Sequence, residues 1–352
     1  MVKQMNRVGI IGATGYVAME LVRILAGHSG LKLSLLVSHS QAGSLFSDIY
    51  PAFSGVVDLV LETLDPDQIA EQCDFAITAL PHGVSSEIVP ALLDRGLRVI
   101  DHSGDFRYRD VSAYEQAYKL KHPRPDLLAE AVYGLPEIYR NSIRSARLVA
   151  NPGCYPTCSI LAVMPLLKAG VLNLDSIIID AVSGISGAGR KGDTSWSYCE
   201  TAEGFKAYGV VGHRHTSEIE QEYGLIAGNP TPLTISFTPH LAPMKRGMLA
   251  TVYADLLPGV ETSSLSQYYE TAYADEPFVR FLTDSTSPNT LNVTYSNFAD
   301  VSLHIDSRTN RVKILCAIDN LGKGAAAQAV QSLNIMAGLP ETSGLKNAGC
   351  LI

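Results

Sequence analysis

The chain of 352 residues is long enough for two domains, and its 46% hydrophobic and 18% charged residues are typical of an ordinary globular protein. Its net charge of -8 argues against nucleic acid or an anionic membrane as the main partner, because both attract a basic surface. The six cysteines show no zinc spacing, and no secretory signal opens the chain, so we expect a cytoplasmic protein with reduced thiols. Apolar runs are interrupted before the ~18 residues at which a membrane span becomes plausible.

Short apolar runs alternate with helix-like segments in the first part of the chain. The predicted strands are Arg7–Gly12, Leu31–Val37, Leu59–Leu61, Phe75–Leu80, Arg98–Asp101 and Leu148–Ala150, and the predicted helices are Val17–Leu25 and Val84–Arg95. Strand–helix alternation predicts an α/β domain with a parallel sheet and helices on both of its faces.

The pattern changes after Asn151. A buried helix is predicted at Ile160–Leu167, and longer strands are predicted at Ser176–Ser183, Leu233–Pro239, Met248–Ala254 and Val312–Asp319. We expect a second, α+β domain built on a mostly antiparallel sheet. A final helix, Gly324–Met336, could return to pack on the first domain. The expected division is therefore 1–150 with 320–352, and 151–319.

A glycine turn joins the first predicted strand to the first helix. In Gly9-Ile-Ile-Gly12-Ala-Thr-Gly15-Tyr-Val-Ala18, Gly12 permits a tight turn and Gly15 lets the backbone approach a pyrophosphate. The helix start offers N–H groups and a partial positive charge to the phosphates. A tight turn without a ligand is the alternative, but the placement favours a Rossmann-type dinucleotide site. Its cofactor-binding candidates are Gly12, Thr14, Gly15, Tyr16 and Val17.

The end of the second strand carries no carboxylate. NAD-selective sites place an acidic side chain there to bind the ribose 2′-hydroxyl. Here the residues from Val37 to Gly43 include Ser38, His39 and Ser40, whose side chains can donate to a 2′-phosphate. We therefore predict NADP rather than NAD, with Ser38 and Ser40 as cofactor contacts. The alternative is a polar surface loop.

A cysteine occupies the next strand-to-helix turn, Asn151-Pro-Gly-Cys154-Tyr-Pro156-Thr. Pro156 suits a first helical turn, which would place Cys154 beside the N–H groups of a helix start. That position favours the thiolate and makes the sulfur nucleophilic. Cys158, one turn later, is expected to face the interior. Cys154 could equally be a small buried apolar residue, which is the usual fate of a free cysteine.

Two histidines precede a predicted helix that Thr216 or Ser217 would cap, with capping-box spacing between Ser217 and Glu220. We expect His213 and His215 to lie on the end of a loop and to point outward. One of them could be a general acid/base, since imidazole titrates near neutral pH. Ordinary polar loop histidines are the alternative, and a metal site is disfavoured because no third ligand lies nearby.

Three further segments concentrate groups that bind anions. Arg107 follows a strand end, where α/β sheets place ligands, and a guanidinium can fork onto a carboxylate or phosphate. The run from Gly184 to Arg190 is rich in small residues that let backbone N–H groups close on a ligand. Arg246 is either a substrate contact or an interface residue. Each segment alone could be a solvated turn.

These segments together resemble N-acetyl-γ-glutamyl-phosphate reductases, within the aspartate-semialdehyde dehydrogenase superfamily. The resemblance is carried, in order, by Gly12–Tyr16, Asp105–Arg107, Tyr133–Glu137, Asn151–Thr157, Ser186–Arg190, His213–Thr216, Pro239–Met244 and Asp319–Gly324. These motifs span nearly the whole chain. Departures from the family pattern are Ala18 in place of a third glycine, the absence of an arginine at Ser38-His39-Ser40, and Ser217 where proline is frequent.

The resemblance implies an NADPH-dependent oxidoreductase of arginine biosynthesis that reduces an acyl phosphate through a cysteine thioester and releases phosphate. It implies that Cys154 is the nucleophile and that His215, rather than His213, is the acid/base. The substrate-binding candidates are Arg107, Arg190, His213 and Arg246, and the remaining cofactor contacts are Gly187, Ala188 and Asn320. A homo-oligomer is expected.

Two alternatives remain open from the residues alone. The same chemistry could act on another acyl phosphate, such as aspartyl or aminoadipyl phosphate. The chain could also be a Rossmann-type binding protein without catalysis, although an intact Cys154 and His215 speak against that. A cysteine hydrolase would leave the glycine turn unexplained.

Overall fold

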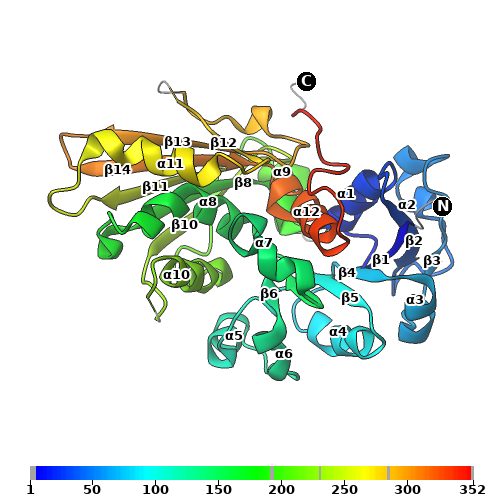
Figure 1. The fold of residues 1–352 in the computed structure, drawn as a ribbon. Coiled ribbons are helices and arrows are strands. Elements are labelled where there is room, and N and C mark those ends of the chain that lie inside the picture. The colour runs from blue at the N-terminus through cyan, green and yellow to red at the C-terminus, as the bar shows by residue number, and fades with distance from the viewer. Residues whose placement is uncertain (1–4, 191–193, 230, 284–285, 350–352) are drawn as a thin grey trace. The chain divides into compact units, whose positions relative to one another are not determined.

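The computed structural model describes residues 5–190, 194–229, 231–283 and 286–349. The described residues fall into two compact units (Figure 1). The first comprises Met1–Pro152 and Ala325–Lys346, and the second comprises Gly153–Gly324 and Asn347–Ile352. The chain therefore passes between the units three times: between Pro152 and Gly153, between Gly324 and Ala325, and between Lys346 and Asn347.

The first unit is built on a seven-stranded sheet of order β3-β2-β1-β4-β5-β7-β6, in which every pair of neighbours is parallel. Its strands are β1 (Asn6–Ile11), β2 (Leu31–Val37), β3 (Leu61–Glu62), β4 (Phe75–Thr78), β5 (Arg98–Asp101), β6 (Val132–Tyr133) and β7 (Leu148–Ala150). The reversal of strand order beside β1 is the topology of a doubly wound nucleotide-binding sheet.

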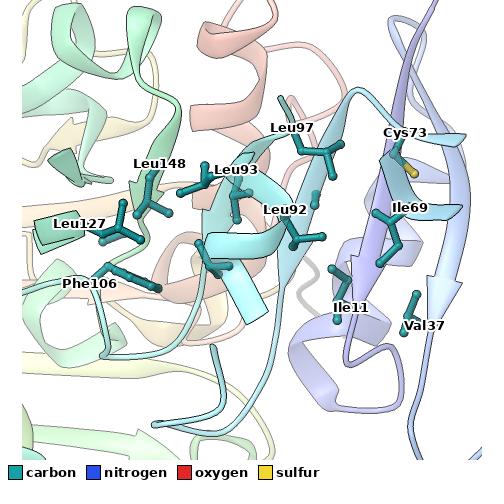
Figure 2. Close-up of a cluster of buried hydrophobic side chains, with 14 of the residues drawn as sticks. Ile11, Val37, Ile69, Cys73, Leu92, Leu93, Leu97, Phe106, Leu127 and Leu148 are labelled. Carbon is teal, nitrogen blue, oxygen red and sulfur yellow. The ribbon is translucent and has the colours of Figure 1, made fainter. Parts of the chain in front are cut away.

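Helices accompany this sheet on both faces. They are α1 (Tyr16–Leu25), α2 (Phe46–Ile49), α3 (Pro66–Gln72), α4 (Ser85–Asp94), α5 (Val111–Tyr118), α6 (Asp126–Glu130), α7 (Pro136–Ser145) and α12 (Ala327–Met336). Figure 2 shows part of this unit's core, in which Ile69 of α3 and Leu92 of α4 lie near Ile11 of β1, and Leu127 of α6 lies near Leu148 of β7. Burial of these side chains supplies the main driving force for the unit's folding.

The last helix, α12, packs against α1 and α7 of the same unit. Arg98 of β5 fixes its end, because Nη1 donates to the carbonyl of Met336, while Nε and Nη2 donate to the carbonyls of Ala146 and Arg144. A segment far along the chain thus completes the first unit. The sequence placed this helix at Gly324–Met336; in the structure a π-helical turn, Gly322–Ala326, precedes α12.

The second unit contains a seven-stranded mixed sheet of order β12-β13-β14-β11-β8-β10-β9. The strands are β8 (Ile178–Gly184), β9 (Lys206–Ala207), β10 (Ser236–Ala242), β11 (Met248–Asp255), β12 (Val279–Phe281), β13 (Ala299–Asp306) and β14 (Arg311–Ile318). All neighbours are antiparallel except β8 with β10 and β12 with β13. The expected α/β architecture with one parallel and one mostly antiparallel sheet is therefore confirmed.

One long buried helix, α8 (Cys154–Ala169), packs across β11, β13 and β14. Helices α10 (Arg214–Ile226) and α11 (Leu265–Tyr273) pack against α8, and Figure 1 shows α11 lying along the same sheet; α9 (Tyr198–Thr201) is a single short turn. Two tyrosines tie these helices together, since Tyr223 Oη donates to the carbonyl of Ser159 and Tyr269 Oη to that of Ala162, both at 2.8 Å. The middle of α8 is therefore bound to both of its neighbouring helices.

Across the described part of the chain, no helix is both long and apolar enough to cross a membrane. Within the same residues, no group of three or more His, Cys, Asp or Glu side chains is arranged to hold a metal ion. Cys350, one of the six cysteines of the sequence, lies outside the described residues.

Candidate active site

The turn between β1 and α1 requires glycine at position 12. Gly12 has φ +90°, and a Cβ there would lie 2.5 Å from the carbonyl oxygen of Ala79. The N–H groups of Gly12 and Ala13 both donate to the carbonyl of Val37, at 3.0 and 2.9 Å. These bonds join the turn to the end of β2, which is the other place where the sequence predicts cofactor contacts.

The start of α1 fits a phosphate-binding role. Gly15 is its N-cap, no side chain caps the helix, and a Cβ at Gly15 would meet no atom within 4 Å. Tyr16 and Val17 form the first turn, and the carbonyl of Thr14 accepts a 2.9 Å hydrogen bond from Tyr50 Oη. Tyr50 is a support that the glycine pattern did not reveal.

The predicted 2′-phosphate contacts differ in exposure. Ser38 is buried, with its N–H donating to the carbonyl of Glu62 at 3.0 Å, whereas His39 and Ser40 are exposed. Ser40 and His39 are thus placed to meet a solvent-facing group, and Ser38 is held in the sheet.

Cys154 is the first residue of α8, with Gly153 as N-cap and Pro156 in the first turn. Its side chain is half-buried. The structure thus places the sulfur at a helix start, where the helix dipole favours an anion. Cys158 is fully buried, and its Sγ donates to the carbonyl of Cys316 at 3.1 Å. Its predicted packing role is confirmed.

His215 and Glu218 of α10 both reach Gly153, directly before Cys154. A Cβ at position 153 would lie only 2.5 Å from Nε2 of His215, so the imidazole packs on the glycine backbone. The fully buried carboxylate of Glu218 accepts a hydrogen bond from the Gly153 N–H, with Oε1 at 3.0 Å. His215 is 7% exposed, so the expectation that it points outward from a loop is wrong.

The cap of α10 also differs from the prediction. His213 is the N-cap, and its Nδ1 accepts the His215 N–H at 3.1 Å. Thr216 and Ser217 lie inside the first helical turns, and Glu220 Oε1 accepts from the Ile235 N–H instead of closing a capping box. Hydroxyl residues are the commoner caps, but here the imidazole of His213 accepts the N–H at the helix start.

Aromatic rings enclose His213. Tyr155, Tyr208, Phe237 and His215 all meet it edge to face, with ring centroids 5.7, 5.4, 5.6 and 4.9 Å away. Burial, together with the neighbouring positive charge of Arg214, lowers the pKa of His213 to about 4. The imidazole is therefore neutral near pH 7.

The two tyrosines around His213 are likewise uncharged at neutral pH, because their phenols keep their protons. Tyr208 Oη donates to Tyr155 Oη at 3.3 Å, and Tyr155 Oη donates to the carbonyl of His240 at 3.0 Å. Burial raises the pKa of Tyr208 to about 12 and raises that of Tyr155 as well.

Asn320 joins two loops that the sequence singled out. Its Oδ1 accepts the Gly247 N–H and its Nδ2 donates to Ser186 Oγ, both at 2.9 Å. The second loop continues through Gly187 and Ala188, of which Gly187 is exposed. The predicted contacts Gly187, Ala188 and Asn320 thus come together in the unit that carries Cys154.

Each of the three predicted arginines has a different setting. In the first unit, Arg107 is buried, with Nε donating to the carbonyl of Asn151 and Nη2 to that of His102, both at 2.8 Å. In the second unit, Arg246 pairs with the buried Asp319 at 2.8 Å and stacks on the ring of Tyr295. Arg190 is exposed, one residue after Gly189.

Glu218, Tyr155 and Tyr208 are the members of this site that sequence reasoning missed. Glu218 could have been found by its spacing, because a residue three positions after His215 lies on the same side of a helix. Tyr208 carried no local signal, since only the folding of its loop brings it to His213.

The comparisons with known proteins agree with this architecture. Residues 7–146 match a family model described as semialdehyde dehydrogenase, NAD binding domain, and residues 154–320 match semialdehyde dehydrogenase, dimerisation domain. Among solved structures, aspartate semialdehyde dehydrogenase II from Vibrio cholerae, complexed with ASA, aligns at a TM-score of 0.73 and 17% identity, covering 96% of this chain and 99% of that one. Aspartate semialdehyde dehydrogenase with NADP from Candida albicans aligns at a TM-score of 0.67 and 16% identity, covering 94% of this chain and 100% of that one. Sheets, site and family models thus define a semialdehyde dehydrogenase.

Relatives of higher sequence identity show to which family of semialdehyde dehydrogenases the chain belongs. The N-acetyl-gamma-glutamyl-phosphate reductase of Acetivibrio thermocellus is 54% identical over 98% of this chain and 99% of its own length. The N-acetyl-gamma-glutamyl-phosphate reductase of Citrifermentans bemidjiense is 50% identical over 97% of this chain and 98% of its own length. The chain belongs to the N-acetyl-gamma-glutamyl-phosphate reductase family.

Proposed function

We propose that this protein reduces N-acetyl-γ-glutamyl phosphate to N-acetylglutamate 5-semialdehyde with release of phosphate, as a step of arginine biosynthesis. The observation that carries the proposal is the meeting of His215 with Gly153 at the start of α8, where Cys154 stands. A nucleophilic sulfur at a helix start beside an imidazole is the arrangement that thioester chemistry needs.

The β1–α1 turn fits a dinucleotide. Gly12 closes the turn in a conformation that other residues resist, and the side of Gly15 is open where a pyrophosphate would approach. We propose that Gly12, Thr14, Gly15, Tyr16 and Val17 hold the pyrophosphate end. We further propose that Ser38 and Ser40 select NADP and that Gly187, Ala188 and Asn320 face the nicotinamide.

The chemistry begins with the Cys154 thiolate. Its Sγ attacks the acyl carbon, the C–O bond to phosphorus breaks, and phosphate leaves with the electron pair, so that a thioester forms. The developing oxyanion needs N–H donors. Because the Gly153 N–H is bonded to Glu218 and Pro156 has none, we assign this role to the amides of Cys154 and Tyr155.

A bound nicotinamide supplies the hydride that turns the thioester into a thiohemiacetal. His215 donates a proton to the oxygen as the thiohemiacetal forms. It takes that proton back as the C–S bond breaks, and the aldehyde and the Cys154 thiolate are released. The fully buried Glu218, one turn along α10, is placed to favour the charged imidazolium that donates the proton and that forms again when the proton returns.

Cationic side chains are proposed to hold the anionic substrate. Arg190 is exposed beside the Gly187–Gly189 loop, and Arg107 and Arg246 each have part of their guanidinium bonded to protein. A pre-positioned guanidinium binds a carboxylate or phosphate with little further loss of side-chain entropy.

We also propose the division of labour between the parts of the chain. Residues 1–150 with 320–352 bind NADP, and residues 151–319 carry catalysis and form a homo-oligomer. The description of the matching second family model as a dimerisation domain supports the oligomer. The reaction has no need of nucleic acid or a membrane, and we place it in the cytoplasm.

The reverse reaction tests the proposal. N-acetylglutamate semialdehyde with NADP⁺ should give NADPH only when phosphate is present. Cys154→Ser should lower kcat at least ~10³-fold, while the matched variant Cys158→Ser keeps the activity of its folded fraction. Faster turnover of aspartate semialdehyde or aminoadipate semialdehyde would overturn the substrate assignment, and turnover by Cys154→Ser would overturn the mechanism.

A further inference from the structure

The two histidines of α10 stand in different relations to Cys154. The imidazole of His215 packs against Gly153, whereas His213 is the N-cap of α10 and turns its Nδ1 onto the backbone N–H of His215. Both lie in the same unit as Cys154. One imidazole therefore meets the helix start that carries the sulfur, and the other meets the backbone of the first.

The capping bond fixes the tautomer of His213. Because Nδ1 accepts the His215 N–H, the proton of the neutral ring is on Nε2. A ring in this state cannot take up a second proton without breaking the cap. The same bond sets the backbone of His215 in the first turn of α10, which decides where its side chain starts.

The ring of His213 is also fixed in place by its neighbours. Tyr155 of α8, Tyr208 and Gly209 of the preceding loop, and Phe237 of β10 pack around it; a Cβ at Gly209 would lie 3.2 Å from its Cδ2. His215 meets its remaining side edge to face, at 4.9 Å between centroids. A ring enclosed in this way limits the movement of the imidazole beside it.

We propose that His213 is a positioning residue: by capping α10 and packing edge-on against His215, it holds the His215 imidazole against Gly153 beside Cys154. The inference rests on the proposed function and assigns the acid/base role to His215 alone. The titratable groups around His213 agree with this role. They are Arg214 on the same helix, His215, and the uncharged phenols of Tyr155 and Tyr208.

The test compares two replacements of His213. Asparagine is among the best N-caps, and its Oδ1 can accept the same N–H, whereas alanine offers no acceptor. His304→Ala, on β13, is the matched control. This imidazole shares a hydrogen bond with Ser302 Oγ of the same strand, at 3.0 Å from Nε2. His213→Ala should lower kcat roughly 100-fold with KM changed less than about threefold, and His213→Asn should recover at least about tenfold of the loss.

A second readout requires neither cofactor nor substrate. The rate of alkylation of Cys154 by iodoacetamide is followed against pH, with the peptide that contains Cys154 quantified by mass spectrometry. We expect His213→Ala to shift the pH profile, and His213→Asn and His304→Ala to keep the profile of the unmodified protein. Should the alanine variant fail to fold, His213→Gln replaces it, because its longer amide side chain is a poor cap.

Three results would overturn the positioning role. They are equal losses of kcat in His213→Asn and His213→Ala, an increase in KM as the main effect of both, or an unchanged alkylation profile in His213→Ala. If the unmodified protein shows no phosphate-dependent NADP reduction, the proposed function fails, whereas the alkylation profiles still decide the role of His213.

Discussion

Replacing Gly153 by alanine isolates the contact on which the site depends. Gly153 has φ −66° and ψ 155°, which alanine adopts without strain, so the backbone gives no reason for an effect. The added Cβ would lie 2.5 Å from Nε2, 2.8 Å from Cε1 and 3.0 Å from Cδ2 of His215. The imidazole must therefore retreat by about 1 Å to reach ordinary contact, and a displacement of that size costs on the order of 100-fold in rate.

The assay is kcat for phosphate-dependent NADP reduction, with the melting temperature measured alongside. Gly204→Ala is the matched control in the same unit, because a Cβ there would meet its nearest atom at an ordinary 3.7 Å. We expect Gly153→Ala to lose kcat while it stays folded, and Gly204→Ala to behave as the unmodified protein. A Gly153→Ala variant with undiminished kcat would refute the argument that His215 acts from this position.

Three further predictions concern cofactor binding, packing and acid stability. Gly12→Ala should abolish NADPH binding in a fluorescence titration, since the residue has φ +90° and its Cβ would meet the Ala79 carbonyl at 2.5 Å; unchanged binding would contradict the turn assignment. Cys158→Ala should lower the free energy of unfolding by roughly 1–2 kcal/mol in urea without changing kcat of the folded enzyme, because it removes a buried sulfur and its bond to a carbonyl. The folded pKa of His213, about 4, lies below the ordinary 6.5, so the unfolded chain binds more protons between those values and stability falls as the pH drops through this range. The loss attributable to this group approaches about 3 kcal/mol at its limit, and urea unfolding at both ends of the range should show it reduced in His213→Asn.

Most strands of the first unit could be predicted because each is an apolar run between segments of a different pattern. β2 has the predicted bounds, Leu31–Val37, and β7 matches at Leu148–Ala150. β6 (Val132–Tyr133) could not be predicted, because a two-residue strand is defined by its pairing with β7 and leaves no periodic signal. β13 (Ala299–Asp306) was missed although Val301, Leu303 and Ile305 alternate with polar residues, a pattern that indicates a strand.

The position of Cys154 at a helix start followed from local chemistry. Asn-Pro-Gly before it and Pro156 after it are local signals that predict a turn and a first helical turn. The surroundings of the two histidines did not follow, because they depend on contacts with Gly153, Tyr155 and Tyr208 that are distant in the sequence. Local preference placed the cap at Thr216 or Ser217, and tertiary packing placed it at His213.

The most direct test of the account is to trap the acyl enzyme. N-acetylglutamate semialdehyde and NADP⁺ are mixed with the enzyme in the absence of phosphate, so that the thioester has no phosphate to accept its acyl group. We predict a burst of NADPH equal to the enzyme concentration and, after acid quenching, one N-acetylglutamyl group on the peptide that contains Cys154. A burst with the acyl group on another residue, or NADPH formation with no covalent adduct, would contradict the central claim that Cys154 is the nucleophile.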